Sequence, residues 1–173
     1  VGRAKAVQMA EKARCAGGGA EEMCAAVSEL AKVFEVLSAA GDFDAAGTQV
    51  GSVIFAVKPG DGSAREQAAS CQKVLGGLAN IAREYATKRY RSNLINWGML
   101  PFLLDGEGKE LPFANGDYVF IPGIRRAVKE RSSVLKAYVV GGSVREFTLR
   151  LGELTEDERE IILKGCLINY YRS

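Results

Sequence analysis

Short β-branched runs alternate with helix-like patterns from residue 50 to the end of the chain. The first run, residues 50–57, is rich in Val, Ile and Phe and ends at Pro59-Gly60, which is typical of a buried strand followed by a turn. Further strand-like runs lie at residues 78–85, 99–104 and 117–121, and helical patterns at 66–75, 86–96 and 123–130. The alternation predicts an α/β or α+β domain, and we expect an α/β fold with a mixed β-sheet flanked by helices.

The C-terminal third carries two further local signals. Residues 134–140 and 144–151 flank Gly141-Gly142-Ser143, a pattern that predicts a β-hairpin. Thr155 followed by Glu158 predicts a capping box that opens a helix, and Gly165 is expected to end that helix.

The first 45 residues have a different character. They are Ala-rich and predict two helices separated by Gly17-Gly18-Gly19. The second helix carries an apolar stripe at helical spacing, which is either ordinary packing or an interface to a missing part of a longer protein: Met23, Val27, Leu30, Phe34 and Leu37. We expect a helical lead-in over residues 1–45 and a second domain over 46–173. The chain opens on Val1 rather than Met, so a fragment or a processed product is expected.

Composition excludes several classes of function. The 173 residues contain no histidine, so this chain alone cannot build a Ser-His-Asp triad, a Cys-His pair or a His-ligated metal site. A formal net charge of +2 disfavours nucleic acid and anionic membranes as partners, and no apolar run approaches the roughly 20 residues of a membrane helix. The four cysteines lack C-x-x-C spacing, so we expect reduced thiols in a cytoplasmic protein and no metal site within the chain: Cys15, Cys24, Cys71 and Cys166.

Residues 58–67, KPGDGSAREQ, lie between a predicted strand and a predicted helix. Gly60 and Gly62 let the backbone pass close to a ligand, and the N–H groups at the helix start together with Arg65 could hold a carboxylate or phosphate. The alternative is purely structural, because Ser63 and Glu66 match an S-x-x-E capping box. The segment lacks the third glycine of a dinucleotide fingerprint and the Gly-Lys-Ser/Thr of a P-loop.

Three segments resemble one known family. GDGSARE at residues 60–66 resembles the G-x-G-S-S-R-E/D loop of aconitases and related iron–sulfur hydro-lyases, which opens a helix in their C-terminal swivel domain. RSNL at 91–94 followed by GMLP at 98–101 is similar to the segment that follows that loop in the family. GCLINY at 165–170 is similar to the glycine-rich final helix of these domains. The resemblance covers about residues 48–173 and implies an aconitase swivel-domain-like fold.

The resemblance also implies site residues. Ser63 matches the catalytic base of the family, which takes a proton from the carbon next to a substrate carboxylate, and Arg65 matches an arginine that binds that carboxylate. Gly62 and Ala64 flank them as substrate-binding positions, although aconitases proper carry a second serine where Ala64 stands. The segment at residues 91–93 is interpreted either as a solvated helix face or as a support for the serine loop.

Finally, the resemblance implies partners outside this chain. The complete enzyme would hold a 4Fe–4S cluster on cysteines of upstream domains in the same polypeptide or of a large subunit, and this chain by itself would be inactive. The expected reaction is reversible dehydration of a small hydroxy tri- or dicarboxylic acid such as citrate or isocitrate. The alternatives are a separate small subunit of an isopropylmalate isomerase-type dehydratase, and a non-catalytic anion-binding or interaction domain.

Overall fold

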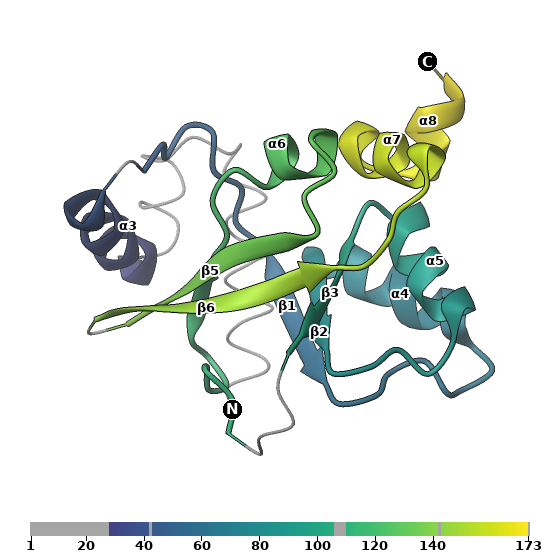
Figure 1. Cartoon of the computed structure of the whole chain (residues 1–173), viewed down its shortest axis with the longest axis horizontal. Helices are drawn as coiled ribbons and strands as arrows, with labels where there is room; N and C mark the ends of the chain where they lie inside the picture. The colour runs from purple at the N-terminus through teal and green to yellow at the C-terminus, as the bar shows by residue number, and fades with distance from the viewer. Residues whose placement is uncertain (1–27, 42, 106–109, 142, 173) are drawn as a thin grey trace. The chain divides into compact units, whose positions relative to one another are not determined.

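The computed structural model describes residues 28–41, 43–105, 110–141 and 143–172 (Figure 1). The chain divides into two compact units, each made of three segments. The first unit comprises Val1–Ser52, Glu107–Pro122 and Lys136–Phe147, and the second comprises Val53–Gly106, Gly123–Leu135 and Thr148–Ser173. The first predicted helix, the Gly17-Gly18-Gly19 break, Met23 and Val27 lie outside the described residues. The division into a helical lead-in over residues 1–45 and a domain over residues 46–173 stays a prediction.

The first unit is built around helix α3, Ser28–Ala40. The described members of the predicted apolar stripe are buried inside the unit, with Leu30, Phe34 and Leu37 at most 8% exposed. The Phe34 ring packs against Phe43 at 5.1 Å between centroids, and Phe43 packs in turn against Phe120 at 5.5 Å. This part of the stripe is therefore ordinary core packing.

The sheet has six strands in the order β1-β2-β3-β6-β5-β4. Their bounds are β1 Ser52–Ala56, β2 Gly77–Ala82, β3 Leu100–Leu104, β4 Tyr118–Phe120, β5 Val134–Val140 and β6 Val144–Leu151. β2 pairs parallel with β3 in the register Ala79 to Leu100, and β3 pairs antiparallel with β6. The predicted mixed sheet is confirmed, and so are the two strands of the predicted hairpin, which are neighbours in the sheet.

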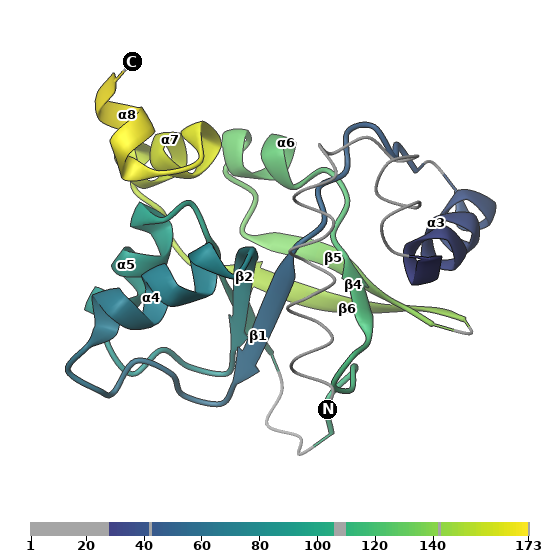
Figure 2. The same ribbon diagram turned by 180° about the vertical axis from the view of Figure 1, so that it is seen from behind.

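The remaining helices belong to the second unit. They are α4 Arg65–Val74, α5 Lys88–Asn96, α6 Ile124–Lys129, α7 Glu156–Lys164 and α8 Leu167–Arg172. Figure 2 shows α4 and α5 side by side, and they pack on β2 and β3 respectively. A buried cluster of Ala69, Tyr90, Leu94 and Met99 joins these elements. None of the helices in the described part of the chain is long and apolar enough to cross a membrane.

The predicted strand over 78–85 ends earlier than expected, at Ala82. The backbone N–H groups of Arg83 and Glu84 both donate to the carbonyl oxygen of Val57, each at 3.1 Å. The chain therefore leaves the sheet in order to bind the segment that follows β1.

The start and the end of α7 are as predicted. Thr155 Oγ1 accepts a hydrogen bond from the N–H of Glu158 at 3.2 Å, and Glu158 Oε2 accepts one from the N–H of Thr155 at 2.9 Å. Gly165 ends the helix with a φ of 90°. A Cβ atom at Gly98 would overlap the carbonyl oxygen of Gly165, so the turn after α5 and the end of α7 approach each other too closely for any side chain at residue 98.

Candidate functional site

Three of the four predicted site residues lie on the loop of residues 57–64, between β1 and α4, and the fourth begins α4. Gly62, Ser63 and Ala64 are exposed, and Arg65, the first residue of α4, is half-buried. The four residues are close together because they are consecutive in the sequence, and they lie where the chain enters α4.

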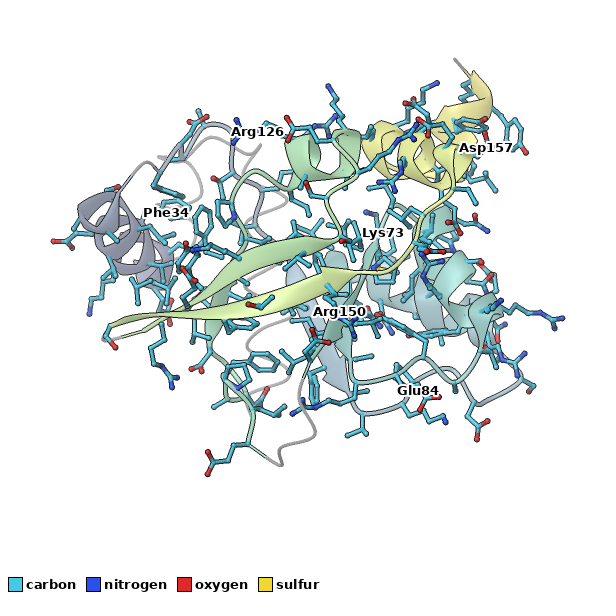
Figure 3. All side chains as sticks on the ribbon, viewed as in Figure 1. Phe34, Lys73, Glu84, Arg126, Arg150 and Asp157 are labelled. Carbon is cyan, nitrogen blue, oxygen red and sulfur yellow. The ribbon has the colours of Figure 1, made fainter. Side chains whose placement is uncertain are left out.

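Backbone hydrogen bonds hold the first half of this loop against the segment between β2 and α5. In addition to the two bonds to Val57, the carbonyl oxygen of Pro59 accepts a hydrogen bond from the N–H of Ala86 at 2.9 Å. An ion pair of 2.9 Å joins Lys58 to Glu84, which is labelled in Figure 3. Both side chains of that pair are more than half exposed, so the backbone bonds contribute most of the attachment.

The carbonyl oxygen of Gly60 accepts two side-chain hydrogen bonds. Arg65 Nε donates at 3.0 Å and Thr87 Oγ1 donates at 3.2 Å. Gly60 has a φ of 95°, a conformation that favours glycine, and it lies directly against Tyr90. The loop is therefore anchored at the residue that opens the predicted GDGSARE segment.

The predicted capping box at the start of α4 is wrong. The helix begins at Arg65, so Ala64 is the N-cap residue and no side chain caps the helix. Glu66 does not reach back to the loop, because its Oε1 accepts a hydrogen bond of 2.9 Å from the indole Nε1 of Trp97. The Ser63 hydroxyl makes no hydrogen bond to any other residue that the structure describes, and its oxygen is therefore not occupied by a capping role.

The N-terminus of α4 faces this loop with unpaired backbone donors. The first intrahelical bond runs from the N–H of Ala68 to the carbonyl oxygen of Ala64, at 3.0 Å. The N–H groups of Arg65, Glu66 and Gln67 precede it and have no intrahelical acceptor, and they form the positive end of the helix dipole. Negative charge is stabilised at such a position.

Arg65 has further hydrogen-bonding capacity. A guanidinium has five N–H donors, and in the described part of the chain only Nε has a partner. Nη1 and Nη2 therefore remain available to a carboxylate, which a guanidinium can bind through two parallel hydrogen bonds.

In the described part of the chain, the side chains of residues 91–93 make no hydrogen bond to the serine loop. Arg91 Nη1 lies 3.4 Å from Glu158 Oε1, and Nη2 donates to the carbonyl oxygen of Glu153, so this side chain joins α5 to the start of α7. The Arg91 side chain is 20% exposed, so this side chain is not part of a solvated helix face. Within the described ranges, the side chains of Ser92 and Asn93 make no hydrogen bond.

A cavity of about 240 Å³ lies beside α4 and was missed by the sequence analysis. No local pattern could have indicated it, because its walls come from segments up to a hundred residues apart. The lining residues are Glu66, Asn93, Asn96, Trp97, Cys166, Leu167 and Ile168. The four predicted site residues are not among them.

Burial is the largest cause of the pKa shift of two side chains in the second unit. Burial lowers the pKa of Lys73, which is labelled in Figure 3, and the nearby Cys166 opposes that shift. Burial also raises the pKa of Tyr85, and Tyr90 adds to the effect. The Tyr85 hydroxyl therefore stays protonated, within hydrogen-bonding distance of the carbonyl oxygens of Asn80 and Phe102.

The described residues do not fit an iron–sulfur cluster. They contain no group of three His, Cys, Asp or Glu side chains that could hold a metal ion. Cys71 is exposed, Cys166 is half-buried, and both are free thiols, whereas Cys15 and Cys24 lie outside the described ranges.

Comparisons with known proteins give three similarities. A family model described as the aconitase C-terminal domain matches residues 21–107, which include the loop with Ser63 and the segment at 91–101. Aconitate hydratase A of Rickettsia bellii is 31% identical over 140 residues, which are 78% of this chain and 15% of that protein, so the chain spans only 15% of this relative's length. The chain in the crystal structure of 3-isopropylmalate dehydratase from Methanocaldococcus jannaschii has 27% sequence identity to this chain. The match covers 74% of this chain and 67% of the dehydratase chain. The TM-score between the two structures is 0.46.

Proposed function

Because this chain belongs to the aconitase C-terminal domain family, we propose that it is the swivel domain of an aconitase-type hydro-lyase in which Ser63 is the catalytic base. The reaction is the reversible loss and addition of water on a small hydroxy tri- or dicarboxylic acid such as citrate or isocitrate.

The unused Ser63 hydroxyl carries the proposal. It is exposed, it has no partner among the described residues, and it directly precedes the N-cap residue of α4. A serine that only began the helix would accept a hydrogen bond from a backbone N–H of the first turn. Because the Ser63 hydroxyl does not cap α4, its oxygen is available for a chemical function.

In the forward direction, Ser63 Oγ accepts a proton from the carbon next to a carboxylate as an alkoxide. The electron pair of the broken C–H bond forms the C=C bond, and the hydroxyl leaves from the neighbouring carbon as hydroxide, which an acid on the second wall of the site would protonate to water. The N–H groups at the start of α4 and the Arg65 guanidinium stabilise the negative charge on the serine oxygen and the carboxylate. Arg65 binds the substrate carboxylate through Nη1 and Nη2, and Gly62 and Ala64 form the adjoining backbone.

The complete site needs a second wall. In this proposal, upstream domains of the same polypeptide or a separate large subunit hold the 4Fe–4S cluster that the family resemblance implies, and the assembled enzyme is cytoplasmic. The alternatives are a separate small subunit of an isopropylmalate isomerase-type dehydratase and a non-catalytic anion-binding domain. The intact mass of the native polypeptide distinguishes a domain of a longer chain from a separate small subunit. A mass several times 18.6 kDa indicates a domain, and a mass near 18.6 kDa indicates a subunit.

The test of the proposal is Ser63→Ala in the assembled enzyme. Loss of a general base costs about 10²- to 10⁴-fold in rate, so kcat should fall by that factor while the melting temperature stays unchanged. Ser70→Ala is the matched control on α4, because Ser70 Oγ donates only to the carbonyl oxygen of Gln67, at 3.2 Å. Retention of kcat in Ser63→Ala would favour the non-catalytic reading.

A further inference from the structure

The bond between Arg65 Nε and the Gly60 carbonyl determines which edge of the guanidinium is free. Arg65 Nε donates to the Gly60 carbonyl oxygen at 3.0 Å. The edge of the guanidinium formed by Nε and one Nη therefore cannot bind a carboxylate unless that bond breaks. The end formed by Nη1 and Nη2 has no partner among the residues that the structure describes. A substrate carboxylate can therefore meet Arg65 end-on, through two parallel N–H···O bonds.

The Gly60 carbonyl is itself held in place by a second donor. Thr87 Oγ1 donates to it at 3.2 Å, from the N-cap position of α5. The same hydroxyl accepts a hydrogen bond from the N–H of Tyr90 at 3.2 Å. Because a hydroxyl has one proton and two lone pairs, it makes both bonds at once, and its rotation is fixed.

Other contacts prevent the carbonyl from turning away. The neighbouring residue, Pro59, is bound to the backbone of Ala86. On the other side, Gly60 is packed against Tyr90, which is only 3% exposed. The α5 N-terminus and the loop thus form one hydrogen-bonded unit around a single carbonyl oxygen.

We propose that Thr87 is a positioning residue for Arg65: by fixing the Gly60 carbonyl, it holds Arg65 Nε and directs Nη1 and Nη2 toward a substrate carboxylate. The proposal deepens the function above and rests on Arg65 being the carboxylate ligand. Thr87 does not touch substrate and takes no part in the proton transfer.

The first experiment compares two variants of the assembled enzyme with the natural protein. Thr87→Val removes both hydrogen bonds of the hydroxyl, and we expect KM to rise about fivefold, as for the loss of one hydrogen bond. We expect kcat to fall far less than the roughly 10²-fold or more expected for Ser63→Ala, because Thr87 acts on Arg65 and leaves the Ser63 hydroxyl in place. Thr87→Ser keeps both bonds and should restore KM.

A second threonine controls for the lost helix cap. Thr155 caps α7 as Thr87 caps α5, with the same 3.2 Å bond to a backbone N–H. Thr155→Val should lower the melting temperature to a similar degree and leave KM unchanged. A raised KM in Thr155→Val equal to that in Thr87→Val would assign the effect to general destabilisation and overturn the proposal.

A double-mutant cycle with Arg65→Lys separates this proposal from the proposed function. Lysine has no Nε–H and no fork, so Arg65→Lys should raise KM by itself, and adding Thr87→Val should then have no further effect on KM. If the two substitutions raise KM independently, so that their fold-changes multiply in the double variant, the positioning role of Thr87 is overturned and the role of Arg65 is not. An unchanged KM in Arg65→Lys would overturn the assignment of Arg65 as carboxylate ligand and the positioning role together.

Discussion

The Cβ atom of Tyr90 lies 2.5 Å from the position that a Cβ atom would take at Gly60. Two atoms of the Tyr90 ring lie within 2.8 Å of the same position. With a φ of 95°, Gly60 also has a backbone conformation that other residues rarely adopt. The loop that carries Ser63 therefore depends on glycine at residue 60.

Gly60→Ala should lower the free energy of unfolding by about 2–4 kcal/mol, since it combines the cost of a left-handed conformation with an overlap in a packed region. Gly62→Ala is the matched change in the same loop, because a Cβ atom there would meet nothing within 4 Å. Its effect on stability should stay within about 0.5 kcal/mol. Urea denaturation of both variants measures the difference, and equal losses would contradict the packing of Gly60 against Tyr90.

Tyr90→Phe tests the buried polar group between α4, β2 and α5. The Tyr90 hydroxyl oxygen accepts hydrogen bonds from Gln72 Nε2 at 2.9 Å and from Asn80 Nδ2 at 3.0 Å, and Asn80 is only 2% exposed. Removing the oxygen leaves these amides without that acceptor, which should cost about 1–3 kcal/mol. Tyr170→Phe removes an exposed hydroxyl that donates to Asp157, and it should cost less stability than Tyr90→Phe. A smaller loss for Tyr90→Phe than for Tyr170→Phe would show that the buried bonds contribute little.

Much of the fold could be predicted because its signals are local. The strands at 134–140 and 144–151 have the predicted bounds, since each is a continuous β-forming run between turn residues. The capping box of Thr155 and the stop at Gly165 were also predicted, because both depend on residues only a few positions apart.

Where partners are distant in sequence, prediction failed. Ser63 and Glu66 have the same spacing as Thr155 and Glu158, yet Glu66 binds Trp97, 31 residues away, and α4 begins too late for Ser63 to cap it. Arg91 binds residues more than 60 positions away. Spacing alone cannot distinguish a side chain that caps its own helix from one that is engaged by another element.

The Lys73 ammonium should make stability depend on pH. Burial lowers its folded-state pKa below the ordinary value of 10.5, so in the interval between these two values the unfolded chain binds more protons and stability rises with pH. Below the interval, the burial cost is present in full. Lys73→Met removes that cost and should stabilise the protein at neutral pH, by an amount that declines as the pH approaches 10.5.

Unfolding free energies at several pH values check this expectation. Lys88→Met removes one positive charge from an exposed position on α5 and serves as the control for net charge. If the difference between Lys73→Met and the natural protein does not change with pH, burial does not act on the Lys73 amine.

The most direct measurement of the central claim is the exchange of the substrate proton with solvent deuterium on the assembled enzyme. If Ser63 accepts that proton, Ser63→Ala should reduce the rate of deuterium incorporation next to the carboxylate by about 10²- to 10⁴-fold, in parallel with kcat. Ser70→Ala should exchange at the natural rate. Deuterium incorporation at the natural rate in Ser63→Ala would show that another group removes the proton, and would contradict the assignment of Ser63 as the base.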